Sequence, residues 1–117
     1  MKQADVERLF KLVHSHAAFA ESVAHTNSPK VRTSGLLNVE SFRVESDTLS
    51  RQYPALRKTV ARIHLSLSEL QAAAGKLTTE TDWSDQQLFS DTNPCHAVWQ
   101  SLQKEVAAFD EELKTWL

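Results

Sequence analysis

The chain has 117 residues, a formal net charge of −2, two glycines and three prolines, a composition that suits one modest domain with little loop-forming sequence. Cys95 is the single cysteine, which excludes an intrachain disulfide and favours a reducing compartment, cytoplasmic or, in a eukaryote, nuclear. The apolar runs are too short to span a bilayer, and charged residues interrupt the N-terminal region where a secretion signal would be apolar. We therefore expect a single domain over residues 1–117 that does not act at a membrane.

Charge is distributed unevenly along the chain. Residues 1–62 hold ten Lys and Arg against six Asp and Glu, whereas residues 63–117 hold three against nine. Such asymmetry is typical of complementary faces within one fold, or of a charged partner.

An apolar stripe with alternating steps of four and three residues predicts a first helix from about residue 4 to residue 25. Its members are Val6, Phe10, Val13, Ala17, Ala20 and Ala24. Further apolar residues, Phe19 among them, widen the stripe to nearly half of the helix circumference. So broad a face indicates contact with two neighbouring helices, or with one helix and another copy of the protein.

Residues 26–37 read as a loop, because Pro29, Gly35 and several Ser, Thr and Asn residues interrupt any helical pattern. Lys30 and Arg32 make this segment basic. A loop of about twelve residues is long for a compact bundle, which favours a mobile or functional segment.

The next helix is predicted to begin after Asn38, whose side chain suits the N-cap position. An apolar heptad pattern then continues in phase from Phe42 past Pro54 to about residue 74. Because two independent helices have no reason to stay in phase, we favour one long helix over residues 39–74, bent at Pro54, over two helices joined by a loop. Gly75 is expected to end this helix in the left-handed conformation.

Two further helix starts are marked near the C-terminus. Ser84 and Gln87 form a capping-box pattern, which predicts a short helix near residues 85–91. Asn93 and Pro94 have the pattern of an N-cap and first helical residue, so the last helix is expected to run from there to the end of the chain.

Together these segments predict an all-α fold. We expect an antiparallel helical bundle of three to four helices, the middle one long and bent or broken at Pro54. Three seam-forming apolar stripes supply its core.

The sequence contains no catalytic, metal or cofactor motif, and we expect a protein that is not an enzyme. His16 and Cys95 both belong to apolar stripes, and an enzyme that used either would need a polar pocket around it. Glu21 and His25 are four residues apart, which we interpret as a surface ion pair, since a metal needs three or four ligands. The other histidines are isolated in the sequence: His14, His64 and His96.

Apolar side chains at exposed-looking positions favour a non-enzymatic protein that binds another protein, or itself, through helical surfaces. An adaptor, an assembly or secretion-type chaperone, and an inhibitor or immunity protein all fit this description. The candidate partner-binding residues are Phe19, Leu65, Trp116 and Leu117.

A second hypothesis is a small accessory or regulatory protein that binds nucleic acid. Within one continuous helix, Arg51, Lys58 and Arg62 would lie within about 40° of one another, opposite the apolar stripe. Such a basic ridge suits phosphate contacts, although it also fits an ordinary solvated face. The residues that would extend the ridge are Lys30, Arg32 and Arg43.

Overall fold

The computed structural model describes residues 2–34 and 38–116, and these residues form six helices and no strand. Two short helices lie in the connections, α2 (Pro29–Ser34) and α5 (Asp85–Leu88). None of the helices in this part of the chain is both long enough and apolar enough to cross a lipid bilayer. The prediction of an all-α bundle is confirmed. The four long helices are α1 (Gln3–Ala24), α3 (Val39–Ser50), α4 (Pro54–Lys76) and α6 (Pro94–Lys114).

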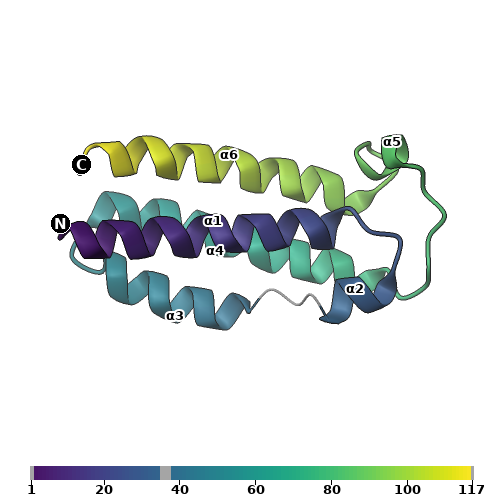
Figure 1. Ribbon diagram of the computed structural model, residues 1–117, viewed down its shortest axis with the longest axis horizontal. Helices are drawn as coiled ribbons and strands as arrows, with labels where there is room; N and C mark the ends of the chain where they lie inside the picture. Colours follow the sequence, from purple (N-terminus) through teal and green to yellow (C-terminus); the bar gives the residue numbers. More distant parts are fainter. Residues whose placement is uncertain (1, 35–37, 117) are drawn as a thin grey trace.

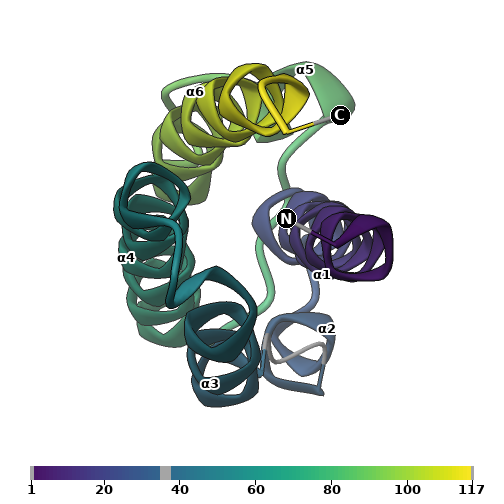
Figure 2. The ribbon, with the colours of Figure 1, turned by 90° about the vertical axis from the view of Figure 1, so that its left-hand side faces the viewer.

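Each long helix runs antiparallel to the long helix before it, so the chain passes up and down one axis (Figure 1). Viewed along that axis, α1 lies diagonally across the bundle from α4, and α3 and α6 occupy the corners between them (Figure 2). The six-residue α2 lies toward the α5 end of the bundle (Figure 1), and the view along the axis places it between α1 and α3 (Figure 2). Both chain termini lie at the opposite end of the bundle from α5 (Figure 1).

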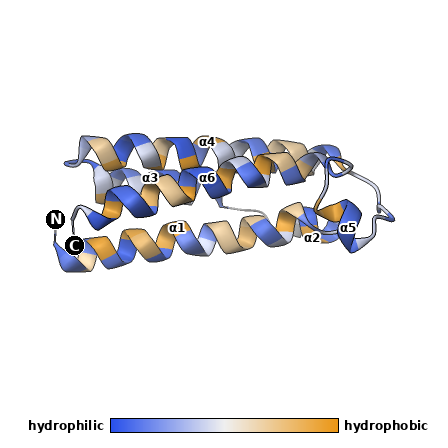
Figure 3. Cartoon of the chain, turned by 90° about the horizontal axis from the view of Figure 1, so that it is seen from above, coloured by the Kyte–Doolittle hydropathy of each residue, from blue (hydrophilic) through white to orange (hydrophobic). Residues whose placement is uncertain are grey.

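The core is built from the apolar stripes that the four long helices turn toward one another. Apolar and polar residues alternate along these helices (Figure 3), as a two-sided helix requires. Phe10 departs from the prediction: it is 46% exposed, because its neighbour Leu9 takes the inward position on α1. Each fully buried Leu or Phe contributes about 1.5–3 kcal/mol through removal of apolar surface from water. The largest fully buried apolar residues are Leu9, Phe42, Leu56, Ile63, Leu67, Leu70, Leu102 and Phe109.

The preferred prediction of one bent helix over residues 39–74 is wrong, because the chain reverses direction before Pro54 (Figure 1). Tyr53 has φ −126° and ψ 83°, outside the helical region, and its N–H donates a hydrogen bond to the carbonyl of Ser50 at 2.9 Å. Proline disfavours a helical conformation in the residue before it, and at the first position of α4 its missing N–H costs nothing. The heptad phase persists across the turn because α3 and α4 face the same core.

The prediction of a loop over residues 26–37 is also wrong in part, since α2 lies within it. Pro29 occupies the first helical position, and the Ser28 hydroxyl accepts a hydrogen bond from the Val31 N–H at 3.3 Å. Proline and a Ser cap, which suggested a loop, are equally the signature of a helix start. Gly35 lies outside the described residues.

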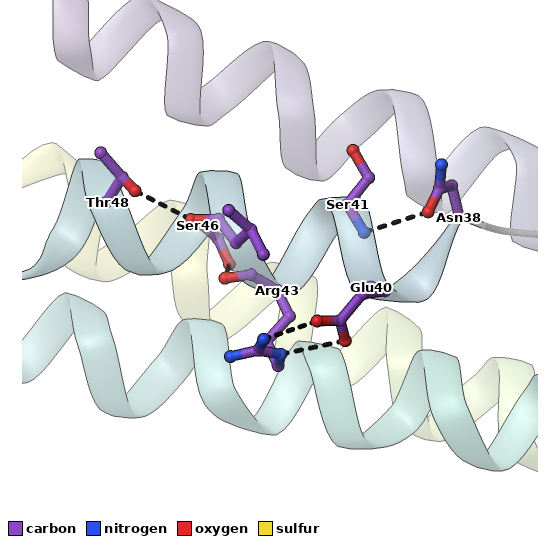
Figure 4. Close-up of polar contacts among 7 residues, drawn as sticks. Asn38, Glu40, Ser41, Arg43, Ser46 and Thr48 are labelled. Carbon is purple, nitrogen blue, oxygen red and sulfur yellow. Dashed lines mark hydrogen bonds and ion pairs between the residues drawn. The ribbon is translucent and has the colours of Figure 1, made fainter.

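Side-chain caps begin three helices where the sequence predicts them. Asn38 accepts a hydrogen bond from the backbone N–H three residues ahead at 3.0 Å (Figure 4). Ser84 and Gln87 form the full reciprocal capping box of α5, although this helix ends at Leu88, earlier than expected. Asn93 caps α6 by accepting from the N–H two residues ahead at 3.1 Å. Each such cap is worth about 1 kcal/mol, so the side chains at these positions define where the helices begin.

Gly75 lies inside α4, which continues to Lys76, and it does not have a positive φ. The predicted left-handed cap at this residue is therefore wrong. A Cβ atom added at Gly75 would meet no other group within 4 Å.

Replacing Gly75 with alanine is expected to raise the free energy of unfolding by about 0.5–1 kcal/mol, because alanine loses less backbone entropy in a helix. Urea unfolding followed by circular dichroism measures the change. The reverse substitution at an exposed position of the same helix, Ala72→Gly, is the matched control and should lower stability by a similar amount. A destabilised Gly75→Ala variant would contradict a helical conformation at residue 75.

Candidate functional site

The predicted partner-binding residues do not form one surface. Phe19 on α1 is 60% exposed and Leu65 on α4 is 58% exposed, but these helices lie diagonally across the bundle (Figure 2). Trp116 follows α6 at the end where the termini lie, and its ring packs against Tyr53 with centroids 4.9 Å apart. Leu117 lies outside the described residues. The three described residues therefore lie on separate parts of the bundle surface.

A groove of about 550 Å³ runs between α1 and α3. Its apolar lining comes from Leu12 on α1 and from Val44 and Leu49 on α3. Leu12 and Leu49 are half-buried and rest on the core, whereas Val44 is 50% exposed. The polar residues that line the groove are Arg8, Lys11, Ser15, Glu45 and Thr48.

The groove continues toward the N-terminus of α1. A second hollow of about 500 Å³ shares Arg8, Thr48 and Leu49 with the first and extends to Lys2 and Tyr53. We refer to the two hollows together as the α1–α3 groove. Its charged residues are Lys2, Arg8, Lys11 and Arg51, against Asp5 and Glu45.

Phe19 prolongs the line of this groove along α1. It follows Leu12 by seven residues and Ser15 by four, spacings that place side chains on one side of an α-helix. The exposed ring therefore lies on the groove side of α1, one turn beyond Ser15. Phe19 is therefore the predicted partner-binding residue whose position on α1 lies in line with the groove.

The basic ridge expected along one continuous helix is absent. Because the chain reverses between α3 and α4, Arg51 lies at the end of α3, separated by the turn from Lys58 and Arg62 on α4. Asp47 pairs with both Arg51 at 3.1 Å and Arg57 at 2.9 Å. The hydrogen bond from Arg51, followed by the charge of Arg57, holds the pKa of the Asp47 carboxyl below its usual range.

Other members of the predicted ridge are also separated from it. Arg43 pairs with Glu40 at 2.5 Å on the side of α3 away from α1 (Figure 4), and the hydrogen bond lowers the pKa of Glu40. Lys30 is exposed on α2, which lies toward the α5 end of the bundle (Figure 1). Lys58 and Arg62 are exposed and have no ion-pair partner among the described residues. The structure therefore divides the six basic candidates among α2, α3 and α4.

Arg32, expected in a basic loop, is instead 2% exposed. Its guanidinium donates hydrogen bonds to the carbonyls of Thr26 at 2.7 Å, Leu77 at 3.1 Å and Thr79 at 3.3 Å, and to the Thr81 hydroxyl at 2.9 Å. A buried arginine is tolerated only when its donors are satisfied. Arg32 is thus a structural residue that attaches the segment after α4 to α2, and it is not available to phosphate.

Two asparagines complete this end of the bundle. Asn27 donates to the Trp83 carbonyl at 2.8 Å and accepts from the Thr81 hydroxyl at 2.8 Å. Asn93 is 1% exposed and donates to the carbonyls of Ala24 at 2.6 Å and Leu88 at 2.9 Å. The partners lie up to 69 residues away in the sequence, so no local pattern could have identified the contacts.

His96, which is isolated in the sequence, meets His25 at the same end. His25 and His96 approach to 3.0 Å between Nε2 and Nδ1, within an aromatic cluster that contains Phe89 and Trp99. The predicted Glu21–His25 ion pair is wrong, because His25 Nδ1 instead contacts the Glu21 backbone carbonyl at 2.9 Å. The His25–His96 contact could not be predicted from the sequence, because 71 residues separate the two histidines.

The single candidates for acid–base or nucleophilic chemistry lie in packed surroundings. Cys95 is fully buried, and burial raises the pKa of its thiol, which disfavours the nucleophilic thiolate. His16 bonds the Leu12 carbonyl at 2.8 Å and packs against the Phe42 ring. Neither residue lines a groove described above.

Within residues 2–34 and 38–116, no group of three or more His, Cys, Asp or Glu side chains is placed to hold a metal ion. Comparison of the chain with models of protein families, with curated proteins and with solved structures finds no match.

Proposed function

We propose that this protein is a non-enzymatic interaction module whose α1–α3 groove receives an acidic amphipathic helix of another protein. The observation that carries the proposal is the groove itself, which combines apolar lining on both helices with basic residues along α1. Helix-in-groove recognition uses this combination of an apolar floor and flanking charges.

The dimensions of the groove suit a helix of a few turns. Along α1 it extends from Lys2 to Ser15, about 20 Å at 1.5 Å per residue. A ligand helix of about 14 residues covers that length. Its apolar face would pack on Leu12, Val44 and Leu49, which a partner would remove further from water.

Charge favours an acidic ligand. Lys2, Arg8 and Lys11 all line the groove from the α1 side, where Asp5 is the one acidic residue among the described groove-lining groups. Complementary charges along a groove speed association and orient the ligand. Glu45 on the α3 side would favour a ligand whose acidic residues face α1.

Fluorescence anisotropy with a designed peptide tests this proposal. The probe is a labelled amphipathic peptide of about 14 residues, with leucines at i, i+4 and i+7 spacing and glutamates beside them. We expect it to bind at least about tenfold more tightly than the same peptide with lysines for glutamates, and to weaken as salt is added. A peptide with serines for leucines should not bind.

Matched variants locate the binding surface. Val44→Asp and the double variant Arg8→Glu with Lys11→Glu should each weaken the acidic peptide by about tenfold or more. Leu65→Asp, at a similarly exposed apolar position on α4, should leave binding unchanged. Absence of saturable binding, or equal loss with Leu65→Asp, would refute the proposal. A dimer in sedimentation that Val44→Asp dissociates would also refute it, because a second copy would then occupy the groove.

A further inference from the structure

His25 and His96 form a side-chain contact between the end of α1 and the start of α6, beside the Asn93 hydrogen bond to the Ala24 carbonyl. His25 is the C-cap residue of α1, and His96 lies in the first turn of α6 and is 7% exposed. The Phe89 ring lies parallel to the His25 ring, with centroids 3.8 Å apart. Trp99 meets His25 edge-on at 4.7 Å. The imidazole pair therefore has aromatic neighbours from α6 and from the segment that follows α5, where Phe89 is itself 48% exposed.

Hydrogen bonding determines which nitrogen of each ring holds a proton. His25 Nδ1 lies 2.9 Å from the Glu21 carbonyl, which only accepts, so this nitrogen must be protonated. In neutral His25, Nε2 is then an acceptor, and its neighbour His96 Nδ1, at 3.0 Å, must be the donor. The second nitrogen of His96, Nε2, keeps its lone pair.

Protonation of this pair has two unequal steps. A first proton binds His96 Nε2 and leaves the Nδ1–H···Nε2 hydrogen bond to His25 in place. A second proton has to bind His25 Nε2, where it removes the acceptor of that bond and brings two imidazolium groups together. The hydrogen bond therefore survives the first proton and is lost with the second.

We propose that the His25–His96 pair is an acid-operated latch, which holds the α5 end of the bundle closed at neutral pH and releases it when both rings are protonated. Phe89 stacks on His25, so movement of His25 away from His96 would also disturb this ring contact in the segment between α5 and α6. The histidine pair lies near the α5 end of the bundle, whereas the charged end of the α1–α3 groove lies near the chain termini (Figure 1). The latch therefore does not depend on the function of that groove.

The groups around His25 favour its neutral form. Burial, the largest effect, and the charge of His96 lower the pKa of His25, whereas the Glu21 carbonyl and carboxylate act in the opposite direction. Phe89, in the segment after α5, contacts His25 with an uncharged ring. The positive charge of Arg32 on α2 acts on the Cys95 thiol, which belongs to the residue before His96. Because the pKa of His25 is lower in the folded state, its contribution is complete above about pH 6.5 and is lost as the pH falls below that value.

Imidazole nitrogen NMR as a function of pH tests the latch in the intact chain. We expect the spectra to report protonated Nδ1 on both His25 and His96 near pH 8. On acidification the Nδ1–H···Nε2 hydrogen bond should persist until His25 Nε2 itself is protonated. In His96→Phe, which keeps an aromatic ring at this position, the His25 titration should move to higher pH. His64→Gln on α4 is the control and should not move it.

Amide hydrogen exchange reports the release itself. Between pH 7.5 and pH 5, exchange in residues 85–96, corrected for its intrinsic pH dependence, should rise severalfold while far-ultraviolet circular dichroism stays constant. His96→Phe should remove this pH dependence. Independent titration of the two rings, unchanged exchange on acidification, or loss of helicity over the whole chain in the same range would each overturn the proposal.

Discussion

Replacing Phe42 with alanine is expected to lower the free energy of unfolding by about 3–5 kcal/mol, because it leaves a cavity in the centre of the bundle. Phe42 is completely buried and contacts the His16 ring of α1 across the interface between α1 and α3. α3 has 12 residues, and Phe42 is the one large aromatic side chain that it places in the core. Urea unfolding at low temperature measures the loss.

Phe19→Ala is the matched control, since it removes the same side chain from a position that is 60% exposed. We expect its stability to change by no more than about 0.5 kcal/mol. Phe42→Leu should cost less than Phe42→Ala, because it leaves a smaller cavity. Equal effects of Phe42→Ala and Phe19→Ala would contradict the packing of α3 described above.

Replacing Arg32 with methionine is expected to destabilise the fold by about 2–4 kcal/mol. Methionine is similar in length but has no donor, so three backbone carbonyls and the Thr81 hydroxyl would each lose a hydrogen bond. Two of these carbonyls, those of Leu77 and Thr79, belong to the segment that follows α4. Urea unfolding measures the loss, and amide exchange in residues 77–84 should increase most.

Two further variants separate charge from geometry at this position. Arg32→Lys keeps the positive charge but lacks the planar fork, so we expect it to recover only part of the lost stability. Arg62→Met, which removes an exposed arginine from α4, should change stability by no more than about 0.5 kcal/mol. A fully stable Arg32→Met protein would show that the buried guanidinium is not what holds residues 77–84.

The sequence was sufficient for most helix boundaries. Apolar periodicity identified the segments that became α1, α4 and α6, and the caps at Asn38, Ser84 and Asn93 identified three helix starts. These features depend on residues three or four positions apart, and their geometry is the same in any helix. The same local information was ambiguous at Pro29, because proline marks both loops and helix starts.

The candidate site was less accessible to sequence reasoning. Leu65 was expected to be exposed, and it is, whereas Phe19 was expected within a broad apolar face and is also exposed. Their positions on separate faces depended on how the helices are arranged around the bundle axis (Figure 2). The groove was not predicted at all, since Val44 and Leu12 belong to different helices and neither has an unusual local pattern.

What the sequence determined by itself was most of the residues of the four long helices and, Phe10 excepted, which side of each is apolar. Tertiary structure alone decided that the chain reverses before Pro54, that Arg32 is buried, and that His25 meets His96. The physical reason is the range of the interactions involved. Helix periodicity and capping act within one or two turns, whereas a hairpin, a buried guanidinium and an imidazole pair are stabilised only by partners brought together when the whole bundle packs.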